Sequence, residues 1–269
     1  MSPHFRDVIE RKSEGNLVGE AGTIEKLAMW GSADYTIEVS QNQLHSGKVD
    51  YADLGAAVYR KVCRTDHSEP GFCVIHLGFN TDSESLRGLQ VDLKNNLARI
   101  HRARLGKDFV CWTAGRFDQQ ESTKLHRDGG PEESLLVLGY EPSEVRSQLA
   151  MADFSKCAGD LGITPAEVLE RYNPMFVPGE EKLSPYMTAL TSFDPTRPQI
   201  VVINNSVAAV GSGSLQGVLH TATILSPLPH HRRVINSMML ASVPLGTAPQ
   251  VSEEALQDFV TTQDVKRRY

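Results

Sequence analysis

The sequence predicts a mainly β protein with flanking helices. Its core is expected to be a double-stranded β-helix, the jelly-roll or cupin-like fold, interrupted by a helical insertion. Short apolar runs are separated by short connections rather than by regular helices, which is typical of antiparallel β structure and not of a doubly wound parallel sheet. No segment has the composition of a linker, so residues 1–269 are expected to form a single domain, with the core at about 70–245 and the insertion at about 143–172.

The first elements are expected to be a strand, a helix, a second strand and a long helix. Tyr35–Val39 has a strand-like pattern, and Asp50 is a suitable N-cap for a helix that continues to about Val62. Gly71–Leu77 is a short apolar run that predicts a buried strand. Apolar residues then recur at spacings of three and four, which places them on one face of a helix that ends before Gly106: Leu86, Leu89, Leu93, Leu97 and Ile100.

The remaining elements follow a change of pattern at residue 109. The stretch 117–128 is polar and is expected to be extended, whereas 143–172 is expected to be helical because Thr164, Pro165 and Glu167 form a capping-box pattern. Ser252 begins a C-terminal helix. Strands are expected at Phe109–Thr113, Ser134–Tyr140, Gln199–Asn204, Leu215–Leu225 and Arg232–Val243.

Composition excludes several classes of protein. Hydrophobic residues make up 40% and charged residues 22% of the chain, as in globular proteins, and the net charge of −6 argues against nucleic acid as a partner. The basic end of the long helix, His101 to Arg104, is therefore interpreted as cations at the negative end of the helix dipole, with an anion site as the alternative. No signal sequence or membrane span is expected, and the four cysteines form no C-x-x-C pair, so we expect a cytoplasmic protein with reduced thiols.

Three residues suggest a metal site. His126 and Asp128 are two positions apart in an extended segment, so their side chains should point to the same side, and His220 lies in a later apolar strand that could bring it to them. Two imidazoles and one carboxylate on one face of a metal define the ligand set of non-haem Fe(II) oxygenases, in which the free positions accept a chelating co-substrate and dioxygen. The alternatives are a surface turn for His126 and a buried structural role for His220.

Arg232 and Arg233 begin the strand that follows His220. A dianionic co-substrate in a partly buried site needs a cation at its far end, and arginine offers a rigid two-pronged donor to a carboxylate. Both arginines are candidates, because the strand period does not decide which of them faces inward.

With these features the chain resembles the 2-oxoglutarate and Fe(II)-dependent dioxygenase superfamily. The segments that carry the resemblance are Lys124–Asp128, Ile203–Asn205, Gly217–His220 and Pro229–Ile235. The resemblance implies a double-stranded β-helix fold, and it implies His126, Asp128 and His220 as the iron ligands. It also implies an arginine paired with 2-oxoglutarate, here Arg233, and an insertion that covers the mouth of the site.

The expected activity is hydroxylation of an unidentified small organic molecule, with Fe(II) as cofactor, 2-oxoglutarate as co-substrate, and release of succinate and carbon dioxide. Taurine-dioxygenase-like members often carry a further arginine at the position of Ser237, so a sulfonate substrate is not expected. Gln119 and Gln120 are weaker candidates for contacts with the substrate, with a solvated strand face as the alternative, and Tyr140 and Asn204 are weaker candidates for hydrogen bonds to the co-substrate. The alternative is a cupin-like metal- or small-molecule-binding protein without oxygenase activity. The sequence does not indicate an oligomeric state.

Overall fold

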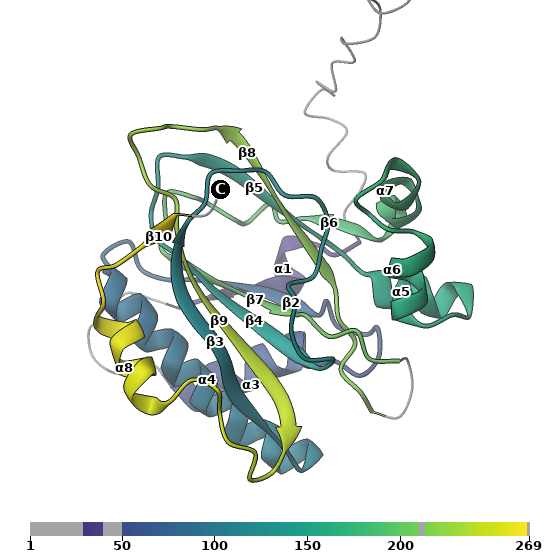
Figure 1. The fold of residues 1–269 in the computed structure, drawn as a ribbon, viewed down its shortest axis with the longest axis horizontal. Coiled ribbons are helices and arrows are strands. Elements are labelled where there is room, and N and C mark those ends of the chain that lie inside the picture. The colour runs from purple at the N-terminus through teal and green to yellow at the C-terminus, as the bar shows by residue number, and fades with distance from the viewer. Residues whose placement is uncertain (1–28, 40–49, 210–212, 268–269) are drawn as a thin grey trace, which may run out of the picture.

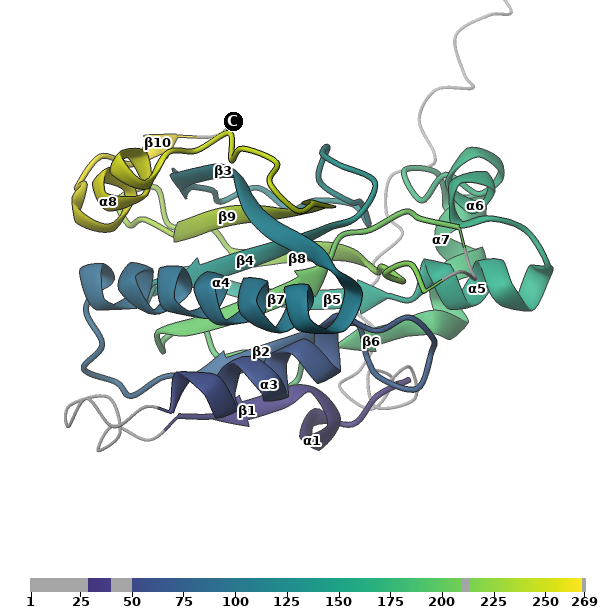
Figure 2. The ribbon, with the colours of Figure 1, turned by 90° about the horizontal axis from the view of Figure 1, so that it is seen from below.

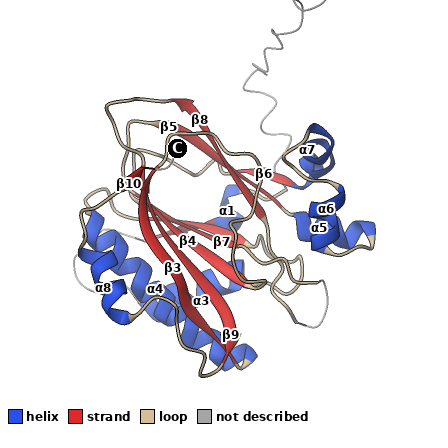
Figure 3. Ribbon diagram, in the orientation of Figure 1, coloured by secondary structure: helices blue, strands red, loops and turns tan. Residues whose placement is uncertain are grey.

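The computed structural model describes residues 29–39, 50–209 and 213–267. Within these ranges the chain forms two sheets (Figures 1 and 3). The larger sheet has seven strands, in the order β1 (Thr36–Glu38), β2 (Phe72–His76), β7 (Gln199–Asn204), β4 (Ser134–Tyr140), β9 (Val234–Pro244), β3 (Lys107–Asp118) and β10 (Lys266–Arg267). The outer pairs β1–β2 and β3–β10 are parallel, and the other pairs are antiparallel.

The smaller sheet faces the larger one. It has three antiparallel strands in the order β6 (Met187–Ala189), β5 (Arg146–Ala152) and β8 (Leu219–Ser226). The two sheets are packed through an apolar layer in which Leu149 and Met151 of β5 meet Phe72, Val74 and other residues of the larger sheet. The described part of the chain is therefore a mainly β fold, as the sequence predicts.

Three helices cover the outer face of the larger sheet (Figure 2). They are α3 (Tyr51–Val62), α4 (Ser83–Leu105) and α8 (Glu253–Thr261). Side chains alternate across a strand, so in β2 Cys73 and Ile75 pack under these helices while Phe72 and Val74 face the smaller sheet. This two-sided burial explains why the β2 segment is apolar throughout.

The other helices lie outside this sandwich. The short helix α1 (Ser32–Tyr35) precedes β1, and three helices follow β5, namely α5 (Phe154–Leu161), α6 (Pro165–Arg171) and α7 (Val177–Leu183), which ends in a 3-10 turn over Ser184–Tyr186. The three helices pack beside one end of the smaller sheet (Figure 1). None of the helices in the described ranges has the length and apolarity needed to cross a bilayer.

Several local predictions are confirmed. Asp50 caps α3 by accepting hydrogen bonds from the backbone N–H groups of Ala52 and Asp53. Gly106 ends α4 with a φ of 63°, a conformation that glycine adopts without strain. The capping box at Thr164 and the helix that begins after Ser252 are also present, as are strands β4 and β7 at the predicted bounds.

The prediction that 143–172 is helical is wrong at its start. Arg146–Ala152 forms strand β5, and the helices begin at Phe154. The burial of β5 alternates, with Ser147, Leu149 and Met151 buried. The segment consists of residues that also suit a helix, so the period-two pattern is recognisable only with the facing sheet present.

The prediction that the residues from His101 to Arg104 are cations at the negative end of the α4 dipole is only partly confirmed. His101 is fully buried, its Nδ1 is 2.9 Å from the Tyr59 hydroxyl and its Nε2 is 2.9 Å from Ser242 Oγ. Burial lowers the pKa of His101 to about 4, so this residue is a neutral core histidine near pH 7. Arg102 and Arg104 are exposed cations, and Arg102 pairs with Asp108 at 2.9 Å.

Candidate metal centre

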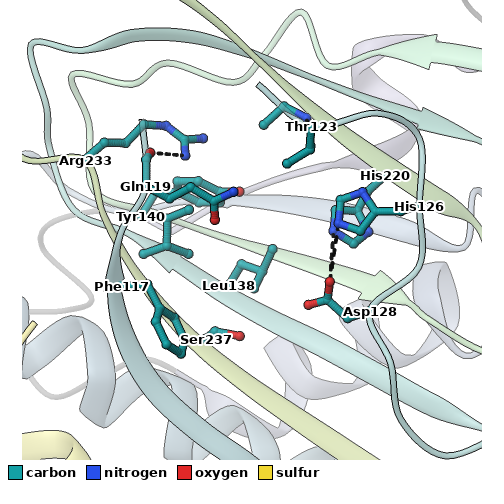
Figure 4. Close-up of a pocket in the computed structure, with 12 residues that line it drawn as sticks. Phe117, Gln119, Thr123, His126, Asp128, Leu138, Tyr140, His220, Arg233 and Ser237 are labelled. Carbon is teal, nitrogen blue, oxygen red and sulfur yellow. Dashed lines mark hydrogen bonds and ion pairs between the residues drawn. The ribbon is translucent and has the colours of Figure 1, made fainter. Parts of the chain in front are cut away.

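His126, Asp128 and His220 converge at one end of the space between the sheets (Figure 4). Asp128 Oδ1 is 3.4 Å from His126 Nε2 and 3.9 Å from His220 Nε2. One potential ligand atom from each residue lies within 4.8 Å of the other two. The three side chains are partly buried, and His220 is the least exposed at 13%.

Strand β8 brings the two histidines together. This strand is at the edge of the smaller sheet, and the segment before Asp128 runs along its free side. His126 and His220 form an antiparallel bridge, in which the backbone N–H of each donates to the carbonyl of the other at 3.0 and 2.9 Å. Thr123 continues the contact by donating its N–H to the Ala222 carbonyl at 2.9 Å. The extended polar segment predicted before Asp128 is therefore held by β8.

Backbone contacts orient the His126 ring. Its Nδ1 lies 2.7 Å from the Lys124 carbonyl, an acceptor, so Nδ1 carries a proton and Nε2 is the ring nitrogen that faces Asp128. The hydrogen bond to Asp128 is the main cause that raises the pKa of His126. Burial, with a smaller contribution from neighbouring His126, lowers the pKa of His220 to about 4. His220 is therefore neutral near pH 7, as a metal ligand must be.

Asn205 holds the backbone of Asp128 from both sides. Its Oδ1 accepts the Asp128 N–H at 2.9 Å, and its Nδ2 donates to the Asp128 carbonyl at 3.0 Å and to Ser134 Oγ at 3.1 Å. Arg127 turns to the other side, where its guanidinium donates to backbone carbonyls that include that of Asn205 at 3.1 Å. The side chains of His126 and Asp128 thus share one side of the segment, as predicted, and Asn205 is a supporting residue of the site.

Replacing Asn205 by leucine is expected to weaken binding of a divalent metal by roughly 10- to 100-fold, because residues that orient a ligand have effects of this size. Calorimetric titration with Co(II) measures the change. Asn204→Leu is the matched control: Asn204 is also buried but donates to the Val62 carbonyl, away from the site. A folded Asn205→Leu protein with wild-type metal affinity would contradict this role.

Arg233 lies at the opposite end of the same pocket (Figure 4). Its side chain is 3% exposed, Nε donates to Ser147 Oγ at 3.0 Å, and Nη1 donates to the Gln119 carbonyl at 3.2 Å. The guanidinium also lies 5.2 Å from the centre of the Tyr140 ring. Within the described residues Nη2 has no hydrogen-bond partner and no carboxylate pairs with this guanidinium. A buried arginine with a spare donor group is suited to an anionic ligand.

The pocket that joins Arg233 to the three converging residues has a volume of about 550 Å³, counted to its open mouth. The residues that line it are Phe117, Gln119, Thr123, His126, Asp128, Leu138, Tyr140, His220, Ala222, Arg233, Ile235 and Ser237. No sequence motif marks Phe117, Thr123 or Leu138 as pocket residues. Their place in the pocket follows from strand register.

The other candidate residues are distributed around the pocket. Arg232 is exposed and lines a separate depression with His230 and His231, so only Arg233 of the arginine pair faces the three residues. Gln119 and Tyr140 line the pocket, whereas Asn204 does not. None of the lining residues belongs to α5, α6 or α7, which contradicts the expectation that the insertion covers the mouth.

The insertion instead packs behind the two histidines. Leu125 and Leu219 each precede one of them, and both are buried in a cluster with residues of α5, α6 and α7. Asp153, which directly precedes α5, is also part of this region and is 3% exposed. It accepts two hydrogen bonds of 2.7 and 2.6 Å from the buried Arg64. Arg64, far away in the sequence, thereby neutralises the carboxylate.

Comparison with known proteins gives limited similarity. No protein-family model matches the sequence, and no curated protein matches it. Among solved structures, a variant of the iron and alpha-ketoglutarate-dependent endoperoxidase NvfI is similar with a TM-score of 0.33 and 14% identity, over 64% of this chain and 78% of that one. The same enzyme in a different conformation is similar with a TM-score of 0.34 and 13% identity, over 70% and 81%. Similarity at this level leaves the family of the chain unassigned.

Proposed function

We propose that this chain is a non-haem Fe(II), 2-oxoglutarate-dependent dioxygenase that hydroxylates a small organic molecule and releases succinate and carbon dioxide. In this proposal the two facing sheets form a jelly-roll core, and the chain is a single domain. One observation carries it: a set of two imidazoles and one carboxylate shares a pocket with the buried and unpaired Arg233 guanidinium.

The residues present fit the metal. His126 and His220 offer nitrogen, Asp128 offers oxygen, and this mixed set suits Fe(II) with positions left open for other ligands. When bound there, the metal supplies the activation of dioxygen together with 2-oxoglutarate. The chain's own contribution is to hold the Nδ1 proton of His126 on the Lys124 carbonyl, which leaves Nε2 as the ligand atom, and to keep His220 neutral by burial.

The co-substrate is held at the other end of the pocket. A carboxylate of 2-oxoglutarate would accept a hydrogen bond from Nη2 of Arg233, the group that has no partner among the described residues. Ser147 and the Gln119 carbonyl fix the guanidinium by holding its other two nitrogens. An ordered cation of this kind costs little reorganisation when the ligand binds.

The buried arginine also favours this function over the alternative, a cupin-like metal-binding protein. A metal site alone gives no reason to bury a guanidinium without a carboxylate, since burial of an unpaired charge is unfavourable. A dianionic co-substrate that spans the pocket supplies the missing partner.

The test is binding and turnover of 2-oxoglutarate by purified protein with Fe(II), followed by calorimetry and by succinate formation. Arg233→Gln is expected to weaken 2-oxoglutarate binding roughly 10- to 100-fold, the range for loss of charge-assisted hydrogen bonds. Arg232→Gln is the matched control, because Arg232 is exposed and outside the pocket. A protein that neither binds nor consumes 2-oxoglutarate would refute the proposed function.

A further inference from the structure

The pocket has a second region that the proposed metal and co-substrate do not use. Arg233 directly precedes β9, Ile235 and Ser237 follow it at alternate positions within the strand, and all three line the pocket. Ser237 lies opposite Gly115 on β3 and Leu138 on β4. Phe117, Leu138 and Ser237 lie together, away from the Arg233 guanidinium (Figure 4). We call these three residues the neutral region of the pocket.

Small residues make room for the Phe117 ring in the wall of the neutral region. Gly115 and Ser237 are paired across two strands, so neither adds a large side chain to this part of the sheet. The Phe117 ring covers Gly115: a Cβ at that glycine would lie 3.0 Å from the Phe117 ring. The wall therefore consists of the Phe117 ring and the Leu138 side chain around the Ser237 hydroxyl. Such a surface suits an apolar ligand group that makes a single polar contact.

Every charge in the pocket already has a use in the proposed function. The lining residues that can carry a charge near pH 7 are the metal-site residues and Arg233. Tyr140 is neutral because burial raises its pKa. Charged side chains nearby are engaged outside the pocket. Lys124 pairs with Glu180 at 2.5 Å, and Asp118 accepts the backbone N–H of Arg233 at 3.0 Å. No counter-ion is left among the described lining residues for a charged substrate.

Two neutral polar groups remain available. The Ser237 hydroxyl and the Gln119 side-chain amide both belong to pocket residues, and neither has a hydrogen-bond partner among the described residues. Resting on the proposed function, we infer that the prime substrate is an uncharged molecule that places an apolar or aromatic group against Phe117 and Leu138 and hydrogen-bonds to Ser237. A substrate charge at this place would be buried without a partner, which is strongly unfavourable.

The experiment compares fragments of equal shape and different charge. The protein is loaded with Zn(II) and 2-oxoglutarate, and NMR titrations measure the affinity of methyl phenyl sulfone against benzenesulfonate and of benzamide against benzamidinium. The uncharged member of each pair is expected to bind at least about tenfold more tightly. Ser237→Arg should reverse the preference within the sulfone pair. Ser226→Arg, which adds the same charge at an exposed position at the end of β8, should leave the preference unchanged.

The outcomes separate this inference from the proposed function. Equal or tighter binding of a charged member overturns the inference, and so does the failure of every fragment to bind while 2-oxoglutarate binds. Ser237→Leu provides a second check that adds no charge: it fills the neutral region, and retention of fragment binding in this folded variant also overturns the inference. If 2-oxoglutarate itself does not bind, the proposed function fails and the inference fails with it.

Discussion

Replacing Asp128 by alanine is expected to abolish metal binding at physiological concentrations of metal and, with it, turnover of 2-oxoglutarate. Asp128 is the only carboxylate of the candidate set, and its Oδ1 faces Nε2 of both histidines. Loss of a residue that merely orients a ligand costs about 10- to 100-fold in affinity, so loss of a ligand should cost at least the upper end of that range. Titration with Fe(II) under anaerobic conditions measures the effect.

The Asp128 prediction has a second readout that needs no metal. The hydrogen bond to Asp128 is the main cause of the raised pKa of His126, so Asp128→Asn should lower that pKa, measured by NMR in the metal-free protein. Glu121→Ala, at an exposed acidic residue of the same segment, is the control for both measurements. Metal binding by Asp128→Ala at wild-type affinity would eliminate these three residues as the ligand set.

Replacing Asp153 by alanine is expected to destabilise the protein by about 3–5 kcal/mol, because it leaves a buried cation without its partner. The side chains of Arg64 and Asp153 are 1% and 3% exposed and are joined by two hydrogen bonds. Asp153 also caps α5 by accepting the Lys156 N–H at 2.9 Å. Urea unfolding measures the loss in the free energy of unfolding.

The control for Asp153 is Asp160→Ala on the same insertion. Asp160 forms an exposed ion pair with Lys156, and such pairs contribute about 0–1 kcal/mol. The double variant Arg64→Met with Asp153→Leu should recover much of the stability, because apolar replacements of a buried ion pair are often nearly neutral. A loss below about 1 kcal/mol in Asp153→Ala would show that Arg64 finds another partner or water.

Local patterns were sufficient for much of the fold. The leucine spacing of α4, the Asp50 cap of α3 and the apolar runs of β4 and β7 each depend on neighbours in the chain, and each is present. The start of the insertion was not predictable in this way. Ser147 is buried because it holds Arg233, a residue 86 positions later, and nothing in the local sequence of β5 records that contact.

The sequence by itself determined the residue types of the candidate site, their order along the chain, and the shared side of His126 and Asp128, because a period of two is a local property of an extended chain. Only the tertiary structure decided that His220 meets them across an edge strand, that Arg233 and not Arg232 faces them, and that Asn205 holds Asp128 from 77 positions away. Strand pairing and sheet packing set these distances, since they join residues whose separation in sequence carries no information about their separation in space.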